Sequence, residues 1–259
     1  MTAEASWSSR TAVVTGGASG IGRATALALA ARGASVAVLD KDAGSADEVA
    51  ARITADGPGT GLSSPCDLSR VGEIRSCVDR IAERFGHIDI LVNCAGIVGP
   101  RVGLADITED IWDSVHAINL KAAVFVTQAV VPHMTAGGRR GGNIVNVGSA
   151  SAHRAVVSSH PYASSKAALE SLTRTLAGEL APHEINVNAV APGVTATAIY
   201  GENDDDEART ARARQGPTAN LFGRFSQPDD IAAAIVFLCA PESRQITGQV
   251  VHVSAGAVV

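Results

Sequence analysis

A tyrosine and a lysine in the second half of the chain have the spacing of an acid–base pair. Tyr162 precedes Lys166 by four residues, in a stretch whose composition predicts a helix over residues 161–180. Residues four apart share one face of a helix, so the ammonium can approach the phenol. A phenol titrates near ~10 in water, and a fixed positive charge beside it lowers that pKa. Such a phenol can take a proton from an alcohol or give one to a carbonyl.

A serine upstream has a place suited to the same chemistry. Ser149 lies thirteen residues before Tyr162, directly after a predicted strand over residues 143–147. Its hydroxyl can hydrogen-bond a substrate oxygen and hold it beside the phenol. A Tyr-x3-Lys pair alone is common by chance, so the catalytic interpretation depends on the motifs around it.

A glycine-rich loop near the N-terminus predicts a phosphate site. Residues 11–32 read as a β-branched strand, then glycines at 16, 20 and 22, then an Ala/Leu-rich helix. Glycines let the backbone approach an anion closely, and a helix N-terminus supplies free N–H groups and a positive dipole end. The spacing differs from the common Gly-x-Gly-x-x-Gly, so a turn without a ligand is the alternative interpretation.

An acidic residue after the second predicted strand indicates which dinucleotide would bind. Asp40 follows the strand over residues 34–39 and lies eighteen residues after Gly22. A carboxylate there suits the ribose hydroxyls of NAD and repels the additional phosphate of NADP. Lys41 follows directly and weakens this discrimination, but the sequence favours NAD as the cofactor.

Strands and helices alternate about seven times along the chain, which predicts an α/β fold with a parallel sheet and helices on both faces. We expect one domain over residues 1–259, with a flexible lead-in at 1–9 and a substrate loop or lid at 194–226. Ligands of such sheets lie beyond the carboxyl ends of the strands. The glycine loop, Asp40, Asp67, Asn93, Ser149 and Pro192-Gly193 are all predicted to lie there.

Composition excludes several other functions. The net charge is -5 and no basic block alternates with aromatics, so no nucleic-acid partner is expected. The longest apolar run, Ile231–Ala240, is too short to cross a bilayer. The four cysteines are scattered without metal-ligand spacing, so we expect reduced thiols, no metal site and a cytoplasmic location.

Taken together, these motifs resemble those of the classical short-chain dehydrogenases/reductases over nearly the whole chain. They stand here as Thr15-Gly16-x3-Gly20-Ile21-Gly22, Asp67, Asn93-Cys94-Ala95-Gly96, Asn119, Ser149, Tyr162-x3-Lys166 and Pro192-Gly193-x3-Thr197. The resemblance implies a Rossmann-type doubly wound fold with a seven-stranded parallel sheet. It also implies that Tyr162 is the acid/base, that Lys166 binds the nicotinamide ribose, and that Asn119 holds a water that links Lys166 to solvent.

The resemblance assigns further residues to the cofactor. Ser19 and Ile21 would contact the pyrophosphate, Asp67 and Leu68 the adenine, and Asn93 and Ala95 the adenosine ribose. Thr195 and Thr197 would reach the carboxamide and the phosphates. The complete cofactor-binding set implied is Gly16, Ser19, Gly20, Ile21, Gly22, Asp40, Asp67, Leu68, Asn93, Ala95, Gly96, Tyr162, Lys166, Pro192, Gly193, Thr195 and Thr197. Tetramers are usual in this family, so a homotetramer is expected.

Two positions depart from the family pattern, Cys94 in the usual Asn-Asn-Ala-Gly and Ser254-Ala255-Gly256 in the usual Asp-Gly-Gly. The sequence leaves three functional hypotheses. The first is an NAD-dependent oxidoreductase that interconverts a secondary alcohol and a ketone. The second is a 3-oxoacyl-carrier reductase, whose basic carrier patch only Arg139, Arg140 and the arginines at 209–214 could supply. The third, a non-catalytic dinucleotide sensor or scaffold, has no need of Asn119, Ser149, Tyr162 and Lys166 together.

Overall fold

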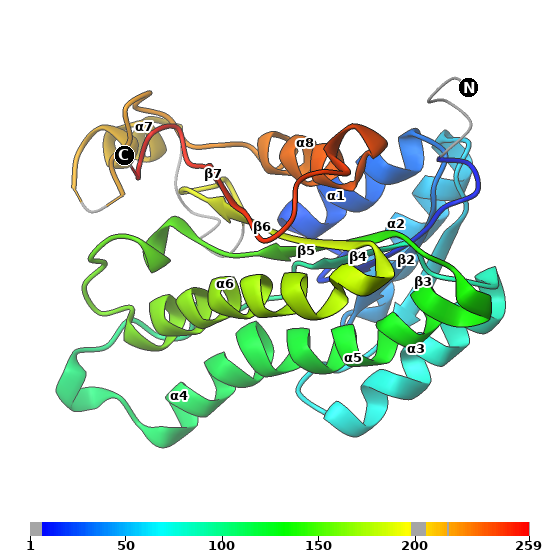
Figure 1. The fold of residues 1–259 in the computed structure, drawn as a ribbon. Coiled ribbons are helices and arrows are strands. Elements are labelled where there is room, and N and C mark those ends of the chain that lie inside the picture. Colours follow the sequence, from blue (N-terminus) through cyan, green and yellow to red (C-terminus); the bar gives the residue numbers. More distant parts are fainter. Residues whose placement is uncertain (1–6, 198–205, 217, 259) are drawn as a thin grey trace.

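In the computed structural model, a central sheet is covered by helices on both faces (Figure 1). The structure describes residues 7–197, 206–216 and 218–258. The strands are β1 (Thr11–Thr15), β2 (Ser35–Asp40), β3 (Gly61–Pro65), β4 (Ile90–Asn93), β5 (Gly142–Val147), β6 (Ile185–Pro192) and β7 (Val250–Val253). The helices are α1 (Gly20–Ala31), α2 (Ala43–Asp56), α3 (Val71–Phe85), α4 (Glu109–His116), α5 (Ala122–Thr135), α6 (His160–Leu180), α7 (Asp206–Arg214) and α8 (Pro228–Cys239).

In the described part of the chain, the seven strands form one sheet in the order β3-β2-β1-β4-β5-β6-β7, and all of its pairs are parallel. The order reverses direction between β1 and β4, which is the switch point of a doubly wound fold. At this point two neighbouring strands send their connections to opposite faces of the sheet. The single-domain Rossmann-type α/β fold predicted from the sequence is therefore confirmed.

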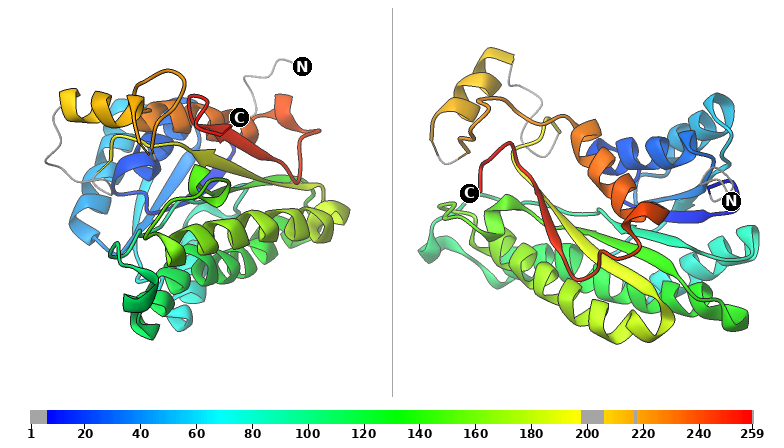
Figure 2. Two further views of the ribbon diagram at one scale, coloured as in Figure 1. Left: turned by 90° about the vertical axis from the view of Figure 1, so that its left-hand side faces the viewer. Right: turned by 45° about the horizontal axis from the view of Figure 1, so that its top comes forward.

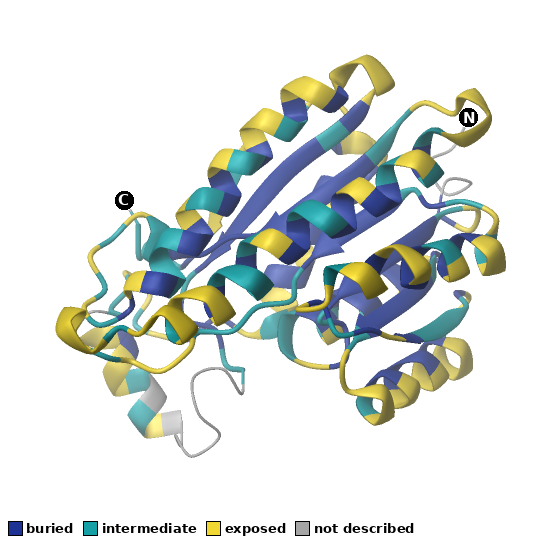
Figure 3. Cartoon of the chain, turned by 90° about the horizontal axis from the view of Figure 1, so that it is seen from below, coloured by how far each residue is buried: buried dark blue, intermediate teal, exposed yellow. Residues whose placement is uncertain are grey.

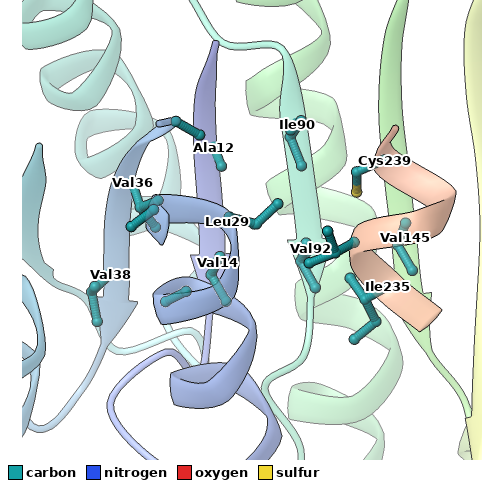
Figure 4. Close-up of a cluster of buried hydrophobic side chains, with 14 of the residues drawn as sticks. Ala12, Val14, Leu29, Val36, Val38, Ile90, Val92, Val145, Ile235 and Cys239 are labelled. Carbon is teal, nitrogen blue, oxygen red and sulfur yellow. The ribbon is translucent and has the colours of Figure 1, made fainter. Parts of the chain in front are cut away.

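The central strands are apolar along their whole length because helices cover them on both sides. Val14, Val36 and Val92 pack under α1, α2 and α8, whereas Val13 and Leu91 pack over α3, α5 and α6. Figure 3 shows the strands buried and each covering helix buried along one stripe. Figure 4 shows Leu29 of α1 and Ile235 of α8 meeting the first of these layers. With so few aromatic residues, the core consists mostly of aliphatic side chains.

Helices α4 and α5 form one long apolar segment, joined by the π-helical turn Ala117–Lys121. By length and hydropathy, Glu109–Gly138 would suffice to cross a membrane. Its α5 part packs against α3 and β4, as a core helix of a water-soluble domain does. The π turn contains Asn119, one of the predicted site residues.

Two segments differ from the sequence predictions. Trp7, within the predicted lead-in, is buried and lies against the guanidinium groups of Arg10 and Arg32. The predicted loop over 194–226 contains the helix α7, while its residues 198–205 and 217 lie outside the described part. Figure 2 shows α7 and the C-terminus at one end of the molecule, and the N-terminus lies at the other. The described part of this segment therefore lies at the end where the strands' carboxyl termini meet, and its role as a substrate loop stays a prediction.

Candidate active site

A cavity of about 300 Å³ lies at the carboxyl ends of the strands, where parallel α/β sheets bind their ligands. It is lined by the glycine loop before α1 and by residues that follow β2 to β6. Of the residues predicted from the sequence, those that line it are Gly16, Ser19, Gly20, Ile21, Gly22, Asp40, Asp67, Leu68, Ala95, Gly96, Ser149, Tyr162, Lys166, Pro192, Gly193, Thr195 and Thr197. Residues far apart in sequence thus meet on one surface.

The glycine loop has the shape that a close anion requires. Gly16 has a φ of 64°, and a Cβ on Gly22 would lie 2.0 Å from the carbonyl oxygen of Gly16. Neither position therefore accepts a side chain without displacing the loop. Ser19 caps α1 without a side-chain hydrogen bond, and the first turn holds no acidic residue. The free N–H groups and the dipole of α1 therefore fit a pyrophosphate.

Asp40 lies beside this loop, at the end of β2. Its Oδ2 accepts a hydrogen bond from the backbone N–H of Ala18 at 3.2 Å, and its Oδ1 accepts one from the N–H of Asp42 at 3.1 Å. The carboxylate is thus held in place while it lines the cavity, next to the exposed Lys41. Hydrogen bonds from Ser69 lower the pKa of Asp67, the acid at the end of β3. Both carboxylates fit ribose or adenine groups rather than phosphates.

Lys166 is the central charge of the site. Its side chain is 3% exposed, and its Nζ donates to the carbonyl oxygen of Val147 at 2.7 Å. The same Nζ lies 5.9 Å from the centre of the Tyr162 ring, one turn earlier on α6. Burial lowers the pKa of Lys166 to about 8, because a buried ammonium loses its hydration. The lysine is therefore still mainly protonated at neutral pH.

Ser149 and Tyr162 connect the main cavity to a smaller one on its open side. Both residues line both cavities. The Oγ of Ser149 accepts a hydrogen bond from the N–H of Ser151 at 3.1 Å, which orients the hydroxyl. Val98 and Val156 contribute apolar walls to the smaller cavity. This second cavity is therefore the candidate substrate site.

Two predicted site residues do not line either cavity. Asn93 is buried, and its Nδ2 donates to Asn146 at 2.9 Å and to Thr127 at 3.3 Å. The side chain of Asn93 therefore holds β4 to β5 and to α5, and it does not face the space expected for a ribose. Asn119 is also buried, with a different set of contacts.

Asn119 joins the loop after β4 to helix α6. Its Oδ1 accepts from the N–H of Ile97 at 2.8 Å, and its Nδ2 donates to the carbonyl of Ile97 at 2.9 Å and to Ser165 at 3.0 Å. Atoms of Asn119 and Lys166 both lie 3.3 Å from where a Cβ of Gly96 would be. The π turn thus brings Asn119 and Lys166 to the same glycine, Gly96, although Asn119 itself does not line the cavity.

Several lining residues lie outside the site set predicted from the sequence, although Lys41 and Cys94 were noted there: Lys41, Cys66, Cys94, Ile97, Ile118, Val147 and Gly148. Most of them adjoin a predicted site residue, which is the signal that could have found them. Burial raises the pKa of the Cys94 thiol to about 12, so this thiol is neutral. Within residues 7–197, 206–216 and 218–258, no group of three or more His, Cys, Asp or Glu side chains could hold a metal ion.

The arginines predicted for a carrier patch are divided between the two ends of the sheet. Arg139 and Arg140 precede β5 and pair with Asp89 and Glu184, at the amino ends of the strands. They therefore cannot serve a ligand in the cavities, and this part of the prediction is wrong. Arg101 and Arg154 line the smaller cavity instead.

Known proteins share this fold and its motifs over nearly their full lengths. A family profile described as "Enoyl-(Acyl carrier protein) reductase" matches residues 16–258. The short-chain reductase protein NovJ of Streptomyces niveus is 39% identical, covering 95% of this chain and 92% of NovJ.

Two solved structures are similar throughout. A short-chain dehydrogenase from Burkholderia cenocepacia in complex with NADP has a TM-score of 0.86 and 37% identity, covering 97% of this chain and 98% of its own. A 3-ketoacyl-(acyl-carrier-protein) reductase from Brucella melitensis complexed with NADH has a TM-score of 0.85 and 30% identity, covering 96% of this chain and 98% of its own.

The chain belongs to the classical short-chain dehydrogenase/reductase family. It is accordingly an oxidoreductase that acts on CH–OH groups with a nicotinamide dinucleotide. The glycine cradle, the free N-terminus of α1 and the carboxylate of Asp40 fit such a cofactor.

The contact between Gly22 and Gly16 generates a prediction. Gly22→Ala will weaken NADH and NADPH binding at least about tenfold, a loss of roughly 1.4 kcal/mol, because the methyl group displaces the loop. Fluorescence titration measures the affinity. Gly178→Ala on α6, where a Cβ meets nothing within 4 Å, is the matched control and keeps wild-type binding.

Thermal unfolding separates a distorted loop from a lost fold in Gly22→Ala. Should that variant not fold, Gly20→Ala replaces it: its Cβ would meet only the Thr197 side chain, at 3.2 Å, and the φ of 51° strains the loop locally. Unchanged affinity in a folded Gly22→Ala protein would contradict the assignment of the loop to the pyrophosphate.

Proposed function

We propose that the protein is an NAD-dependent oxidoreductase that interconverts a secondary alcohol and a ketone, with Tyr162 as the acid/base. The observation that carries this proposal is the buried ammonium of Lys166 beside the Tyr162 ring. A fixed positive charge favours the phenolate and so lowers the pKa of the phenol. A tyrosine tuned in this way can exchange a proton with a substrate oxygen near neutral pH.

The other residues of the site have separate roles in this proposal. When bound, the nicotinamide ring supplies or accepts the hydride. Ser149 hydrogen-bonds the substrate oxygen and orients it toward Tyr162. Lys166 holds the nicotinamide ribose and keeps its charge near the phenol. Asn119 fixes the loop after β4 beside Lys166 and supports the proton path to solvent.

The four residues together favour catalysis over the sensor or scaffold hypothesis. A protein that only senses a dinucleotide needs the glycine cradle, but it needs neither an oriented serine hydroxyl nor a charge beside a tyrosine. Ser149 and Tyr162 also line the second cavity, where a substrate would enter. A serine hydroxyl and a phenol at this entrance are suited to a second molecule that reacts there.

NAD is the proposed cofactor because Asp40 lines the cavity as a restrained carboxylate. Its negative charge would repel the additional phosphate of NADP. The Burkholderia relative is described with NADP and the Brucella relative with NADH, so the family uses both. Lys41, a positive charge directly after Asp40, acts against this preference for NAD over NADP.

We further propose that the protein works in the cytoplasm as a homotetramer. The four cysteines, which lie within the described part of the chain, are free thiols, as in a reducing compartment. Exposed Trp112 on α4 and Phe237 on α8 lie where further subunits would pack, and β7 ends the sheet with an open edge. Size-exclusion chromatography with light scattering measures the mass.

One observation favours the second candidate, a 3-oxoacyl-carrier reductase. Arg101 and Arg154 line the smaller cavity, and no carboxylate is among its described lining residues. Guanidinium groups at this mouth would attract the phosphates of a CoA or phosphopantetheine carrier, while Nη1 of Arg154 also donates to the carbonyl oxygens of Ala219 and Ala257. A higher rate with acetoacetyl-CoA than with a neutral ketone of equal chain length would favour this candidate. Equal or lower rates would reject it.

The acid/base assignment predicts that Tyr162→Phe slows turnover by about 10²–10⁴-fold, because phenylalanine cannot exchange the proton. The dinucleotide will bind as in the wild type, because the ring and the cavity remain. A panel of secondary alcohols with NAD⁺, followed by NADH absorbance, measures turnover. A Tyr162→Phe protein that keeps its rate would contradict the assignment.

The position of Asp40 predicts that NADH binds at least about tenfold more tightly than NADPH, a difference of roughly 1.4 kcal/mol. Asp40→Asn keeps an oxygen acceptor for the N–H of Ala18 and removes the charge. The variant will therefore reduce the preference for NADH over NADPH, mainly by improving NADPH binding. Fluorescence titration with each dinucleotide measures both. A wild-type preference for NADPH would mean that Lys41 outweighs Asp40.

A further inference from the structure

A buried carboxylate follows the two catalytic residues along α6. Glu170 lies one helical turn after Lys166 and two turns after Tyr162, so all three share one face of the helix. It is 3% exposed. Ionised carboxylates at such depth are costly unless they are paired or compensate another charge. The residue therefore needs a physical reason to be there.

The two oxygens of Glu170 have different surroundings. Oε2 lies 2.6 Å from Nε2 of His153. Oε1 is buried without a hydrogen-bond partner, and it would lie 2.6 Å from a Cβ on Gly148. The carboxylate thus lies directly against the backbone that leads to Ser149. One carboxylate oxygen is held by a histidine, and the other is buried against Gly148.

Few titratable or charged groups of the described residues face this carboxylate. They are His153 on the turn after Ser149, His252 on β7, and Lys166 on α6 itself. The rings of His153 and His252 meet edge to face, with centres 4.5 Å apart. Burial, and then the charge of His153, lower the pKa of His252, while Glu170 raises it. The cluster therefore has one acidic member among three basic side chains.

Lys166 is the member that matters for the site. Burial lowers its pKa, while Cys94 and Glu170 act in the opposite direction. The Cys94 thiol is itself neutral, since burial raises its pKa to about 12. Of the two, Glu170 is the carboxylate, and its Oε1 lies against Gly148, the residue after the Val147 whose carbonyl oxygen accepts from Lys166 Nζ. Removing that charge would leave the buried ammonium without this support.

We propose that Glu170, held by His153, is a positioning residue whose negative charge keeps Lys166 protonated in the cofactor cavity. The inference rests on the proposed function, in which Lys166 binds the nicotinamide ribose. A neutral side chain could brace the turn after Ser149 equally well by hydrogen bonds. A carboxylate adds what a neutral side chain lacks, a negative charge between His153 and the buried ammonium of Lys166.

Dinucleotide binding measured against pH tests this without a known substrate. The probe is NADH or NADPH, whichever binds the wild type more tightly, followed by fluorescence. Affinity will fall about fivefold as Lys166 loses its proton, the difference between hydrogen bonds from charged and from neutral donors. In Glu170→Gln the midpoint of this fall will move to lower pH by about one unit, because a nearby opposite charge is lost.

Three variants make the result specific to the charge at this position. Glu179→Gln removes an exposed carboxylate from the same helix and will keep the wild-type midpoint. Glu170→Asp retains the charge, so its midpoint will lie closer to that of the wild type than to that of Glu170→Gln. His153→Gln keeps a hydrogen-bond donor for Glu170 and will also leave the midpoint near that of the wild type. A role limited to packing would change affinity at every pH without moving the midpoint.

The outcomes separate this inference from the proposed function. Lys166→Met will abolish the pH-dependent fall, which identifies the titrating group. If Lys166→Met does so and Glu170→Gln leaves the midpoint in place, the role of Glu170 is rejected and the proposed function stands. If neither dinucleotide binds at any pH, the proposed function fails first.

Discussion

Burial of one ammonium group is the constraint on which the rest of the site depends. The ammonium of Lys166 loses its hydration where it lines the cavity, and it regains one hydrogen bond, from Nζ to the carbonyl oxygen of Val147. A lysine in that position stays charged only if its surroundings compensate the loss. The carbonyl at the end of β5 and the carboxylate of Glu170 both provide this compensation, and α6 is held against β5 as a result.

Polar side chains fasten α6 to the sheet along the same face. Thr173 accepts a hydrogen bond from Asn146 at 2.9 Å, and Asn146 in turn accepts one from Asn93 at 2.9 Å. Because these groups are buried, each lost bond would leave a polar atom without a partner. The network therefore fixes the helix in rotation and along its axis. Tyr162 is placed over the cavity as a consequence of these bonds.

The sequence predicted what depends on local chemistry, and it missed what depends on tertiary contacts. The glycine loop was predictable because Gly16 and Gly22 are required by sterics at fixed positions. Asn93 was assigned to the adenosine ribose by resemblance, and the sequence could not show that its side chain bonds to Asn146 on a neighbouring strand. Trp7 escaped notice because one of its two arginine contacts, Arg32, lies in a distant segment, after α1. The error for Arg139 and Arg140 is of another kind, since both precede the strand predicted over 143–147 and their place at the amino ends of the strands followed from the sequence.

Ionisation of Tyr162 in the free protein tests the central claim most directly. The chain has two tyrosines, so Tyr200→Phe leaves Tyr162 as the single reporter of tyrosinate absorbance. We predict that Tyr162 titrates below the ~10 of a free phenol, and that Lys166→Met raises its pKa. Titration at or above ~10 in both proteins would contradict the claim that the buried lysine charge activates the tyrosine.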